Sequence, residues 1–195
     1  MTEAKIALVT GGSRRIGRAI VEALAGDGWR VAIHANASIT EAEDLARAIG
    51  AQGGEAAAFA ADLADPQAVA GLMPAVIKRF GPVTLLVNNA SLFLRDTLTS
   101  IDVPTWNRQF SVNIRAPSVL AGAMATALPA PREGAIVNIV DQRVLKLTPE
   151  FYSYTLSKAA LHAATRTMAQ ALAPRIRVNA VAPGPVLPNE ADGDE

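Results

Sequence analysis

The stretch IALVTGGSRRIG, residues 6–17, decides the fold. It begins with an apolar run, passes through a turn with glycines at positions 11, 12 and 17, and enters a helical pattern. Backbone N–H groups at the start of a helix attract phosphate, and glycines let a ligand approach the backbone closely. The stretch therefore predicts a strand, a phosphate-binding turn and a helix, as in dinucleotide-binding units. The alternative is an ordinary strand-to-helix turn with surface arginines.

The same alternation continues along the chain. Apolar runs rich in β-branched residues predict strands buried on both faces of a parallel sheet, and Ala/Leu-rich stretches between them predict helices. We therefore predict one α/β domain over residues 1–195, a doubly wound parallel sheet flanked by helices. The predicted strands are residues 6–9, 30–34, 56–60, 84–87, 135–140 and 177–181, and the predicted helices are residues 16–26, 40–49, 66–80, 106–128 and 154–172.

Three local signals refine this outline. Pro117 lies inside the fourth helical pattern, and because proline crowds the carbonyl one turn before it, we expect a bend near Asn113. Ser38-x-x-Glu41 resembles a capping box at the start of the second helix. Only a short polar tail follows Pro188, so we expect no seventh strand.

The composition narrows the function. Lys+Arg and Asp+Glu both number 18, which gives no electrostatic case for binding nucleic acid or an anionic membrane surface. The chain has no cysteine and two histidines, so we expect neither disulfides nor a metal site. No apolar run reaches membrane-spanning length and no signal-peptide pattern precedes the first strand, so a cytoplasmic protein is expected.

Tyr154 and Lys158 are four residues apart, so the phenol and the ammonium share one helix face. A free phenol has a pKa of about 10. Lys158 should lower that pKa, whereas Asp141 should raise it, and the three groups should titrate together. With the phosphate turn, they predict hydride transfer with a proton donor held beside a cation. The alternatives are a solvated lysine at an exposed helix start and, for Asp141, a strand-end cap.

The end of the second predicted strand indicates which dinucleotide binds. It lacks the carboxylate that usually holds the ribose hydroxyls of NAD. Arg14, Arg15 and the Ser38 hydroxyl would instead accept a 2′-phosphate, so we predict NADP(H). His34 is expected to be a strand-end residue with no catalytic role. Asp62 either accepts from the adenine amino group or caps a turn.

These motifs resemble the short-chain dehydrogenase/reductase family over essentially the whole chain. The resemblance implies a Rossmann-type sheet, a nicotinamide cofactor, a tyrosine acid/base and a supporting role for Asn113. It also implies a substrate segment and a last strand that this sequence lacks, and we expect a homo-oligomer, a dimer or a tetramer. The family motifs, in order, are Thr10-Gly11-x-x-x-x-Ile16-Gly17, Asn88-Asn89-Ala90, Asn113, Tyr154-x-x-x-Lys158 and Pro183-Gly184.

Within the family, the sequence is most similar to pteridine and dihydromonapterin reductases. The similar features are Arg15, the run 88–93 and the aspartate thirteen residues before Tyr154, where most members carry serine. The resemblance implies that Phe93 stacks a pterin against the nicotinamide. From the residues alone, an aromatic ring just beyond the fourth strand would stack a flat heterocycle, or else plug the core. Ala37 stands where these enzymes often use an arginine.

A carboxylate at position 141 indicates the substrate class. It would repel the oxyanion that forms as a ketone accepts hydride, whereas it suits a ring with N–H donors and a nitrogen to be protonated. We therefore predict an NADPH-dependent reductase of a pterin-like heterocycle, such as a dihydropterin, dihydromonapterin or dihydrofolate. Reduction of a 3-oxoacyl or other carbonyl substrate, and a non-catalytic nucleotide-binding role, remain as alternatives.

The predicted site has three parts and no metal. The catalytic residues are Asp141, Tyr154, Lys158 and Asn113. The cofactor-binding residues are Gly11, Ser13, Arg14, Arg15, Ile16, Gly17, Ser38, Asp62, Leu63, Asn89, Ala90, Ser91, Tyr154, Lys158, Pro183 and Gly184. The substrate-binding residues are Ser91, Phe93, Asp141 and Tyr154.

Overall fold

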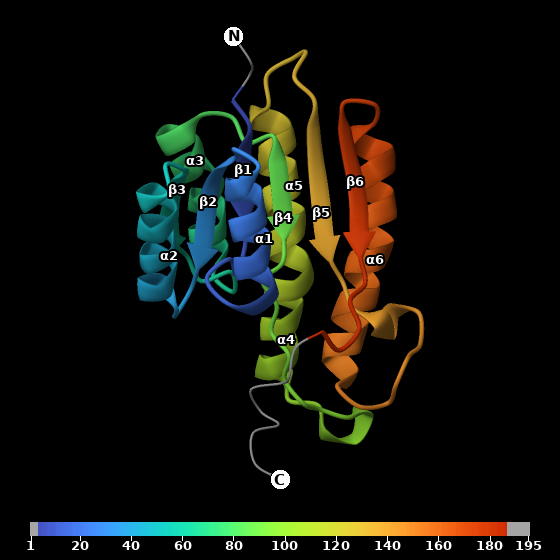
Figure 1. Ribbon diagram of the computed structural model, residues 1–195. Coiled ribbons are helices and arrows are strands. Elements are labelled where there is room, and N and C mark those ends of the chain that lie inside the picture. Colours follow the sequence, from blue (N-terminus) through green and yellow to red (C-terminus); the bar gives the residue numbers. More distant parts are fainter. Residues whose placement is uncertain (1–3, 187–195) are drawn as a thin grey trace.

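The computed structural model describes residues 4–186, which form one parallel sheet with helices on both faces (Figure 1). The strand order is β3-β2-β1-β4-β5-β6, which confirms the predicted doubly wound α/β fold. The strands are β1 (Ile6–Val9), β2 (Arg30–Ala35), β3 (Glu55–Ala60), β4 (Leu85–Asn88), β5 (Gly134–Ile139) and β6 (Ile176–Val181). The helices are α1 (Arg15–Gly26), α2 (Ile39–Ala51), α3 (Pro66–Phe80), α4 (Val103–Phe110), α5 (Ala116–Ala127) and α6 (Tyr152–Leu172).

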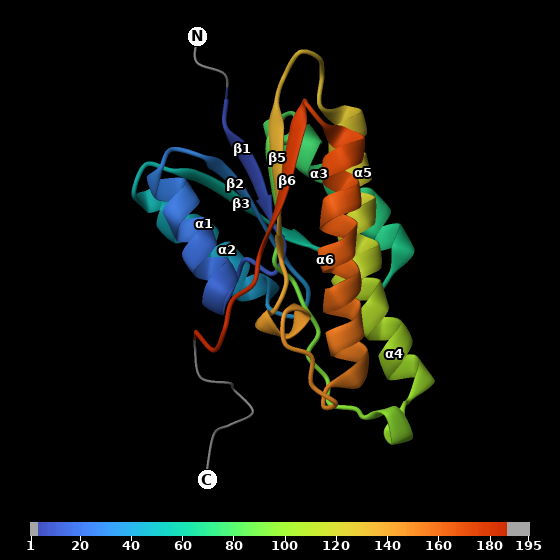
Figure 2. The ribbon, with the colours of Figure 1, turned by 90° about the vertical axis from the view of Figure 1, so that its right-hand side faces the viewer.

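The helices form two layers around the sheet. Figure 2 shows α1 and α2 on one face, and α3, α5 and α6 on the other. The chain builds outward from β1 in one direction through β2 and β3, and then returns to the other side of β1 at β4. In such sheets the ligand crevice lies beyond the carboxyl ends of the strands where this reversal occurs. The site is therefore expected beyond β1 and β4.

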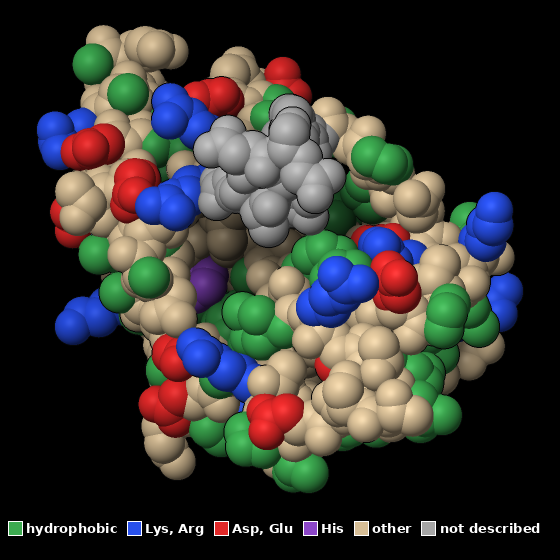
Figure 3. Space-filling model, turned by 90° about the horizontal axis from the view of Figure 1, so that it is seen from below, with side chains coloured by type: hydrophobic (Ala, Val, Ile, Leu, Met, Phe, Trp, Pro, Cys, Tyr) green, Lys and Arg blue, Asp and Glu red, His purple; other side chains and the backbone are tan. Residues whose placement is uncertain are grey.

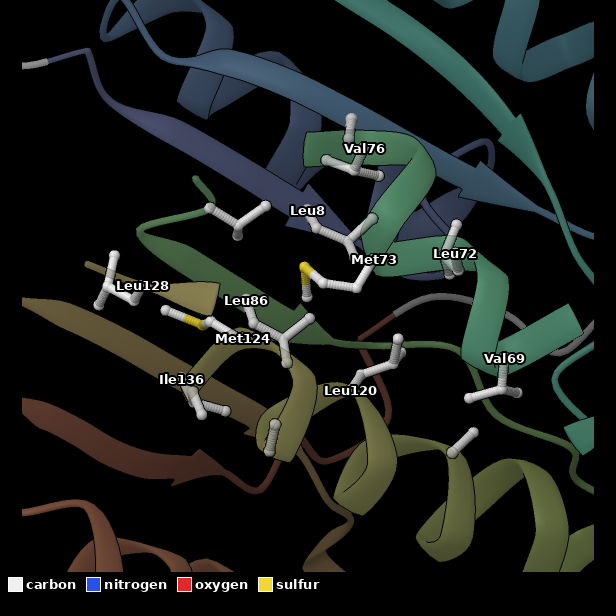
Figure 4. Packing of buried hydrophobic residues seen from close by; sticks show 14 of the residues in the cluster. Leu8, Val69, Leu72, Met73, Val76, Leu86, Leu120, Met124, Leu128 and Ile136 are labelled. Atoms are coloured by element: carbon white, nitrogen blue, oxygen red, sulfur yellow. The ribbon is translucent and has the colours of Figure 1, made fainter. Parts of the chain in front are cut away.

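Apolar side chains fill both spaces between sheet and helices. On the face shown in Figure 4, Leu8, Leu86 and Ile136 of the sheet meet Met73 of α3 and Met124 of α5, all at most 1% exposed. Burying each such side chain stabilises the fold by about 1.5–3 kcal/mol. The short strands β1 and β4 are thereby held rigidly, and their carboxyl ends become a fixed base for a site.

The predicted helix over 106–128 is divided in two. Helices α4 and α5 are joined by one π-helical segment, Ser111–Arg115, which contains Asn113. Pro117 follows in the first turn of α5. Its ring has no N–H group and would crowd the carbonyl of Asn113 in a regular α-helix, so the backbone widens there. The structure thus has a π-helical segment at Asn113, where a bend was expected.

The predicted capping box at Ser38 is wrong. The Ser38 side chain makes no capping hydrogen bond to α2, and its Oγ lies 2.6 Å from the Oγ of Ser13. The Glu41 carboxylate forms an ion pair with Arg14. Both side chains of the expected box are therefore used to hold the turn between β1 and α1.

In the part of the chain that the structure describes, none of the helices combines the length and the apolar character that crossing a bilayer requires. The expected lack of a seventh strand after Pro188 concerns residues 187–195, which lie outside the described residues.

Candidate active site

Two adjoining cavities lie at the carboxyl ends of the strands. Figure 3 looks onto this end of the molecule, where Lys and Arg side chains surround a hollow. The cavities have volumes of about 370 and 640 Å³. They share Arg15, Ile16, Asn89 and Ser91 in their walls, so they are two parts of one elongated site.

The glycine turn after β1 has the geometry of a phosphate cradle. Gly11 has a φ of +61°, and a side chain at Gly17 would place Cβ 2.0 Å from the Gly11 carbonyl oxygen. Arg15 also has a positive φ, +51°, which explains why glycine is often found at its position. The first N–H groups of any helix point out of its end, so the start of α1 suits an anion.

Asn89 braces the turn from the neighbouring strand. Its side-chain amide donates hydrogen bonds of 2.9 Å to the carbonyl oxygens of both Thr10 and Gly11. In return, the Thr10 hydroxyl accepts bonds of 3.0 Å from the backbone N–H groups of Asn89 and Ala90. The ends of β1 and β4 are thus locked together at the centre of the site.

His34 has a role that the sequence did not reveal. It is buried at the end of β2, and its Nδ1 accepts a 3.1 Å hydrogen bond from the Gly11 N–H group. Its Nε2 lies 3.0 Å from the carbonyl oxygen of Ala61. Burial lowers the pKa of His34, so the ring is neutral, accepts at Nδ1 and donates at Nε2. His34 therefore holds the phosphate turn against the end of the sheet.

The predicted cofactor residues surround the smaller cavity. Arg14 forms its ion pair with Glu41 at the rim. Asp62 accepts a 2.8 Å bond from the N–H group of Ala64, so one of its oxygens caps a turn as the alternative assignment expected. The predicted residues in the wall are Gly11, Ser13, Arg14, Arg15, Ile16, Gly17, Ser38, Asp62, Leu63, Asn89, Ala90 and Ser91.

Asp141, Tyr154 and Lys158 meet in the wall of the larger cavity, together with Pro183 and Gly184. The Tyr154 hydroxyl donates a 2.8 Å hydrogen bond to Oδ2 of Asp141. The Lys158 ammonium is 2% exposed and donates a 2.8 Å bond to the carbonyl oxygen of Ile139. Its Nζ lies 5.9 Å from the centre of the Tyr154 ring.

The electrostatic balance favours a protonated phenol. Burial, the charge of Asp141 and their hydrogen bond raise the pKa of Tyr154, against smaller opposing effects of Arg143 and Ser91. The expected lowering by Lys158 does not decide the outcome. Burial lowers the pKa of Lys158 to about 8, although Asp141 acts to raise it. The phenol therefore stays protonated at neutral pH, and the ammonium has the lower pKa of the two groups, about 8.

Phe93 is half-buried and lines the larger cavity. Its ring is stacked on that of Phe151, with centroids 4.1 Å apart, and meets the Tyr154 ring edge to face at 4.6 Å. The guanidinium carbon of Arg143 lies 5.3 Å from the centre of each phenylalanine ring. Nη1 of Arg143 lies 3.5 Å from Oδ2 of Asp141, so the two side chains form an ion pair. Sequence reasoning missed Arg143 and Phe151; their only signal is their closeness in the chain to Asp141 and Tyr154.

The π-helical segment holds Asn113 against the loop after β4. Its amide exchanges two hydrogen bonds with the backbone of Leu92, 2.8 Å at Oδ1 and 2.9 Å at Nδ2. Nδ2 also donates to the Ser157 hydroxyl at 3.0 Å, and Oδ1 accepts from the Ser91 hydroxyl at 3.2 Å. Asn113 therefore connects the loop that carries Ser91 to the helix that carries Lys158.

Curated proteins with similar sequences match this chain over most of its length. An uncharacterized oxidoreductase of Methylorubrum extorquens is 37% identical, over 95% of this chain and 74% of its own length. A 3-oxoacyl-[acyl-carrier-protein] reductase of Synechocystis is 34% identical, over 93% of this chain and 74% of its own length.

Solved structures are similar in both sequence and fold. FolM alternative dihydrofolate reductase 1 from Brucella suis, in complex with NADP, is 55% identical with a TM-score of 0.92, over 96% of this chain and 78% of that one. A short chain dehydrogenase from Burkholderia cenocepacia, also in complex with NADP, is 40% identical with a TM-score of 0.87. The match covers 92% of this chain and 74% of that one. The short chain dehydrogenase family profile matches residues 5–193. The chain therefore belongs to the short-chain dehydrogenase family of oxidoreductases.

Proposed function

We propose that this protein is an NADPH-dependent reductase of a pterin-like heterocycle, such as a dihydropterin, dihydromonapterin or dihydrofolate. The observation that carries the proposal is the 2.8 Å hydrogen bond from the Tyr154 phenol to Asp141 in a cavity lined by Phe93. One wall thus offers an acid, a carboxylate and an aromatic face, which together match a flat ring with N–H donors and a basic nitrogen.

The residues around the smaller cavity fit NADP(H). The turn at Gly11 and Gly17 has no room for side chains, which is what close approach of a pyrophosphate requires. Arg14, Arg15 and Ser38 are the groups that would hold the 2′-phosphate, and no acidic side chain ends β2. The NADP complexes of the relatives support this assignment. The cofactor, when bound, supplies the hydride.

The larger cavity supplies the proton and the orientation. Tyr154 is the proton donor because its phenol, protonated at neutral pH, lines the cavity beside Asp141 and Phe93. Its raised pKa makes it a weaker acid in the free protein, and a bound cation or charged Lys158 would act in the opposite direction. Asp141 orients the ring through its N–H groups, and it also holds the phenolic hydrogen at Oδ2. Lys158, in its charged form, would bind the nicotinamide ribose and balance the charge of Asp141.

The carboxylate separates this proposal from ordinary carbonyl reduction. A fixed negative charge at Tyr154 opposes an oxyanion developing at the same place, and it favours positive charge or N–H donors there. The 55% identity to FolM alternative dihydrofolate reductase 1 supports the same substrate class.

Reduction of a 3-oxoacyl or other carbonyl substrate is the second candidate. The observation in its favour is that several curated relatives at 33–35% identity are named 3-oxoacyl-[acyl-carrier-protein] reductases. The two candidates share the cofactor site and Tyr154, and they differ in what Asp141 contacts.

Steady-state oxidation of NADPH tests the proposal directly. The purified protein is assayed with a dihydropterin, with dihydrofolate and with a 3-oxoacyl thioester at matched concentrations. We expect turnover of a pterin-type substrate at the highest kcat/KM. Turnover of the thioester alone would establish the second candidate, and tight NADPH binding without turnover of any of the three would indicate a non-catalytic nucleotide-binding protein.

A further inference from the structure

Two buried amide side chains, one helical turn apart, hold the loop that carries Phe93. Gln109 at the end of α4 and Asn113 in the π-helical segment are both 0% exposed. Helix α4 packs against α6, as Figure 2 shows. The amides thus lie between the loop after β4 and the helix that carries Tyr154 and Lys158.

The two amides make matching contacts to the backbone of the loop and to a serine of α6. Asn113 exchanges two bonds with the backbone of Leu92 and donates to Ser157. Gln109 accepts a 3.1 Å bond from the Leu94 N–H group, donates to the Leu94 carbonyl oxygen at 3.5 Å, and donates to the Ser153 hydroxyl. Each amide therefore grips one loop residue on both of its backbone polar groups, and each reaches one serine of α6.

The positions of these partners connect them with the chemistry. Ser153 directly precedes Tyr154, and Ser157 directly precedes Lys158. Leu92 and Leu94 flank Phe93, whose ring lines the larger cavity. A shift of the Gln109 side chain would therefore move the aromatic face and the phenol at the same time.

A third contact extends the same loop along α6. The backbone N–H group of Ser153 donates a 3.0 Å bond to the Asp96 carboxylate, and that of Tyr152 donates a 3.2 Å bond to the Asp96 carbonyl oxygen. Asp96 is 5% exposed. Positions 92, 94 and 96 are thus all tied to the helices, whereas Phe93 between them contacts Phe151 and Tyr154.

From this arrangement we infer that Gln109 is a positioning residue, which sets the distance between the Phe93 ring and the Tyr154 hydroxyl. Asn113 is the corresponding positioning residue for Ser91 and Lys158, through its bonds to Leu92 and Ser157. Gln109 touches neither reacting atom, and it acts through Leu94 and Ser153. The inference rests on the proposed function in one respect, namely that Phe93 receives the substrate ring.

The three hydrogen bonds that join Gln109 to Leu94 and Ser153 form a clamp between the loop and α6. Amide hydrogen exchange tests this clamp without any substrate. Gln109→Met keeps the side-chain length and removes all three hydrogen bonds. We expect the Leu94 amide to exchange at least about tenfold faster, with the Leu92 amide unchanged, because local protection follows local hydrogen bonding. Asn107→Leu, at an exposed position of α4, is the matched control and should leave both amides unchanged. Unchanged exchange at Leu94 in Gln109→Met would overturn the clamp. If Gln109→Met does not fold, Gln109→Glu takes its place, because it keeps an acceptor for the Leu94 N–H group. A partial acceleration of exchange at Leu94 is then expected. Exchange at the wild-type rate would overturn the inference.

A double-mutant cycle with Phe93→Ala tests the positioning role. With whichever substrate class the wild-type protein reduces, Gln109→Met should raise KM by roughly fivefold, which is the scale of one aromatic stacking contact. In the Phe93→Ala background the same change should raise KM less than about twofold, because the two residues act through one contact. Equal KM increases in both backgrounds would contradict the inference.

Ser153→Ala isolates the other arm of the clamp. It removes the hydroxyl that links Gln109 to the residue before Tyr154 and leaves the Leu94 bonds in place. We expect kcat to fall with little change in KM, and a change confined to KM would contradict this arm. If no pterin is turned over while Leu94 exchange accelerates as expected, the proposed function fails and the clamp stands.

Discussion

The phenolic oxygen of Tyr154 lies 2.8 Å from Oδ2 of Asp141, and the phenol donates the hydrogen bond. The side chains come from the loop after β5 and from the first turn of α6, thirteen residues apart in the chain. A carboxylate in this place stabilises the neutral phenol and disfavours negative charge on a substrate oxygen.

The hydroxyl of Tyr154 should be required for turnover and should contribute little to the affinity for NADPH. Tyr154→Phe removes the proton and keeps the ring against Phe93, so we expect kcat to fall by about 10²–10⁴-fold with an NADPH dissociation constant close to wild type. Tyr152→Phe is the matched control, because that ring lies 6.1 Å from Trp106 and lines neither cavity. A Tyr154→Phe protein that keeps most of its rate would require another proton donor.

Turnover should fall as the pH rises through about 8, because burial lowers the pKa of Lys158 to about 8 and the proposed function requires its charged form to bind the ribose. Asp141 acts to raise that pKa, so Asp141→Asn should shift the fall to lower pH. Any residual activity of the variant is followed against pH at saturating NADPH. A fall that stays at the same pH in Asp141→Asn would show that Lys158 is not the titrating group.

NADPH should bind more tightly than NADH. Arg15→Ala would remove the charge-assisted contact that we propose to the 2′-phosphate, so it should weaken NADPH binding by roughly 10–100-fold and NADH binding by much less. Dissociation constants for both cofactors in both proteins, measured by quenching of tryptophan fluorescence or by calorimetry, give the comparison. Equal affinities for the two cofactors in wild-type protein would refute the assignment of a 2′-phosphate site.

Gly17 should tolerate no side chain. A Cβ there would lie 2.0 Å from the Gly11 carbonyl oxygen and 2.6 Å from Nδ2 of Asn89, so Gly17→Ala must displace the turn. We expect a loss of stability on the order of 1–3 kcal/mol and a loss of thermal stabilisation by NADPH. Gly26→Ala in the same helix has nothing within 4 Å of its Cβ and serves as the control. Thermal melts with and without NADPH distinguish the two variants.

The sequence was sufficient to predict the sheet, and most of the residues that it assigned to the site line the two cavities. The run 6–17, the strand pattern and Pro117 depend on local rules, and the strand ends lie within about one residue of the prediction. The NADP(H) prediction, which rested on β2 ending without a carboxylate, agrees with the NADP complexes of the relatives. Parallel topology then brings the ends of β1, β4 and β5 to one edge.

The features of the site that the sequence did not predict depend on contacts between residues far apart in the chain. His34 is 23 residues from Gly11, and Gln109 is 44 residues from Ser153, so neither contact has a local pattern. The sequence also left the pKa of Tyr154 open, because Lys158 and Asp141 act in opposite directions. Burial decided the sign, and burial is known only once α6 is packed. Ser38 shows the same limit, since its hydroxyl meets Ser13 instead of its own helix.

The central claim is that the Asp141 carboxylate selects a nitrogen heterocycle over a ketone. The most direct test is the ratio of kcat/KM for a dihydropterin to that for a 3-oxoacyl thioester, in wild-type protein and in Asp141→Ser. We predict that wild type favours the dihydropterin and that Asp141→Ser lowers the ratio by about 10²-fold or more, the scale of one electrostatic contact in an active site. A ratio that favours the thioester in wild type, or that is unchanged in Asp141→Ser, would contradict the claim.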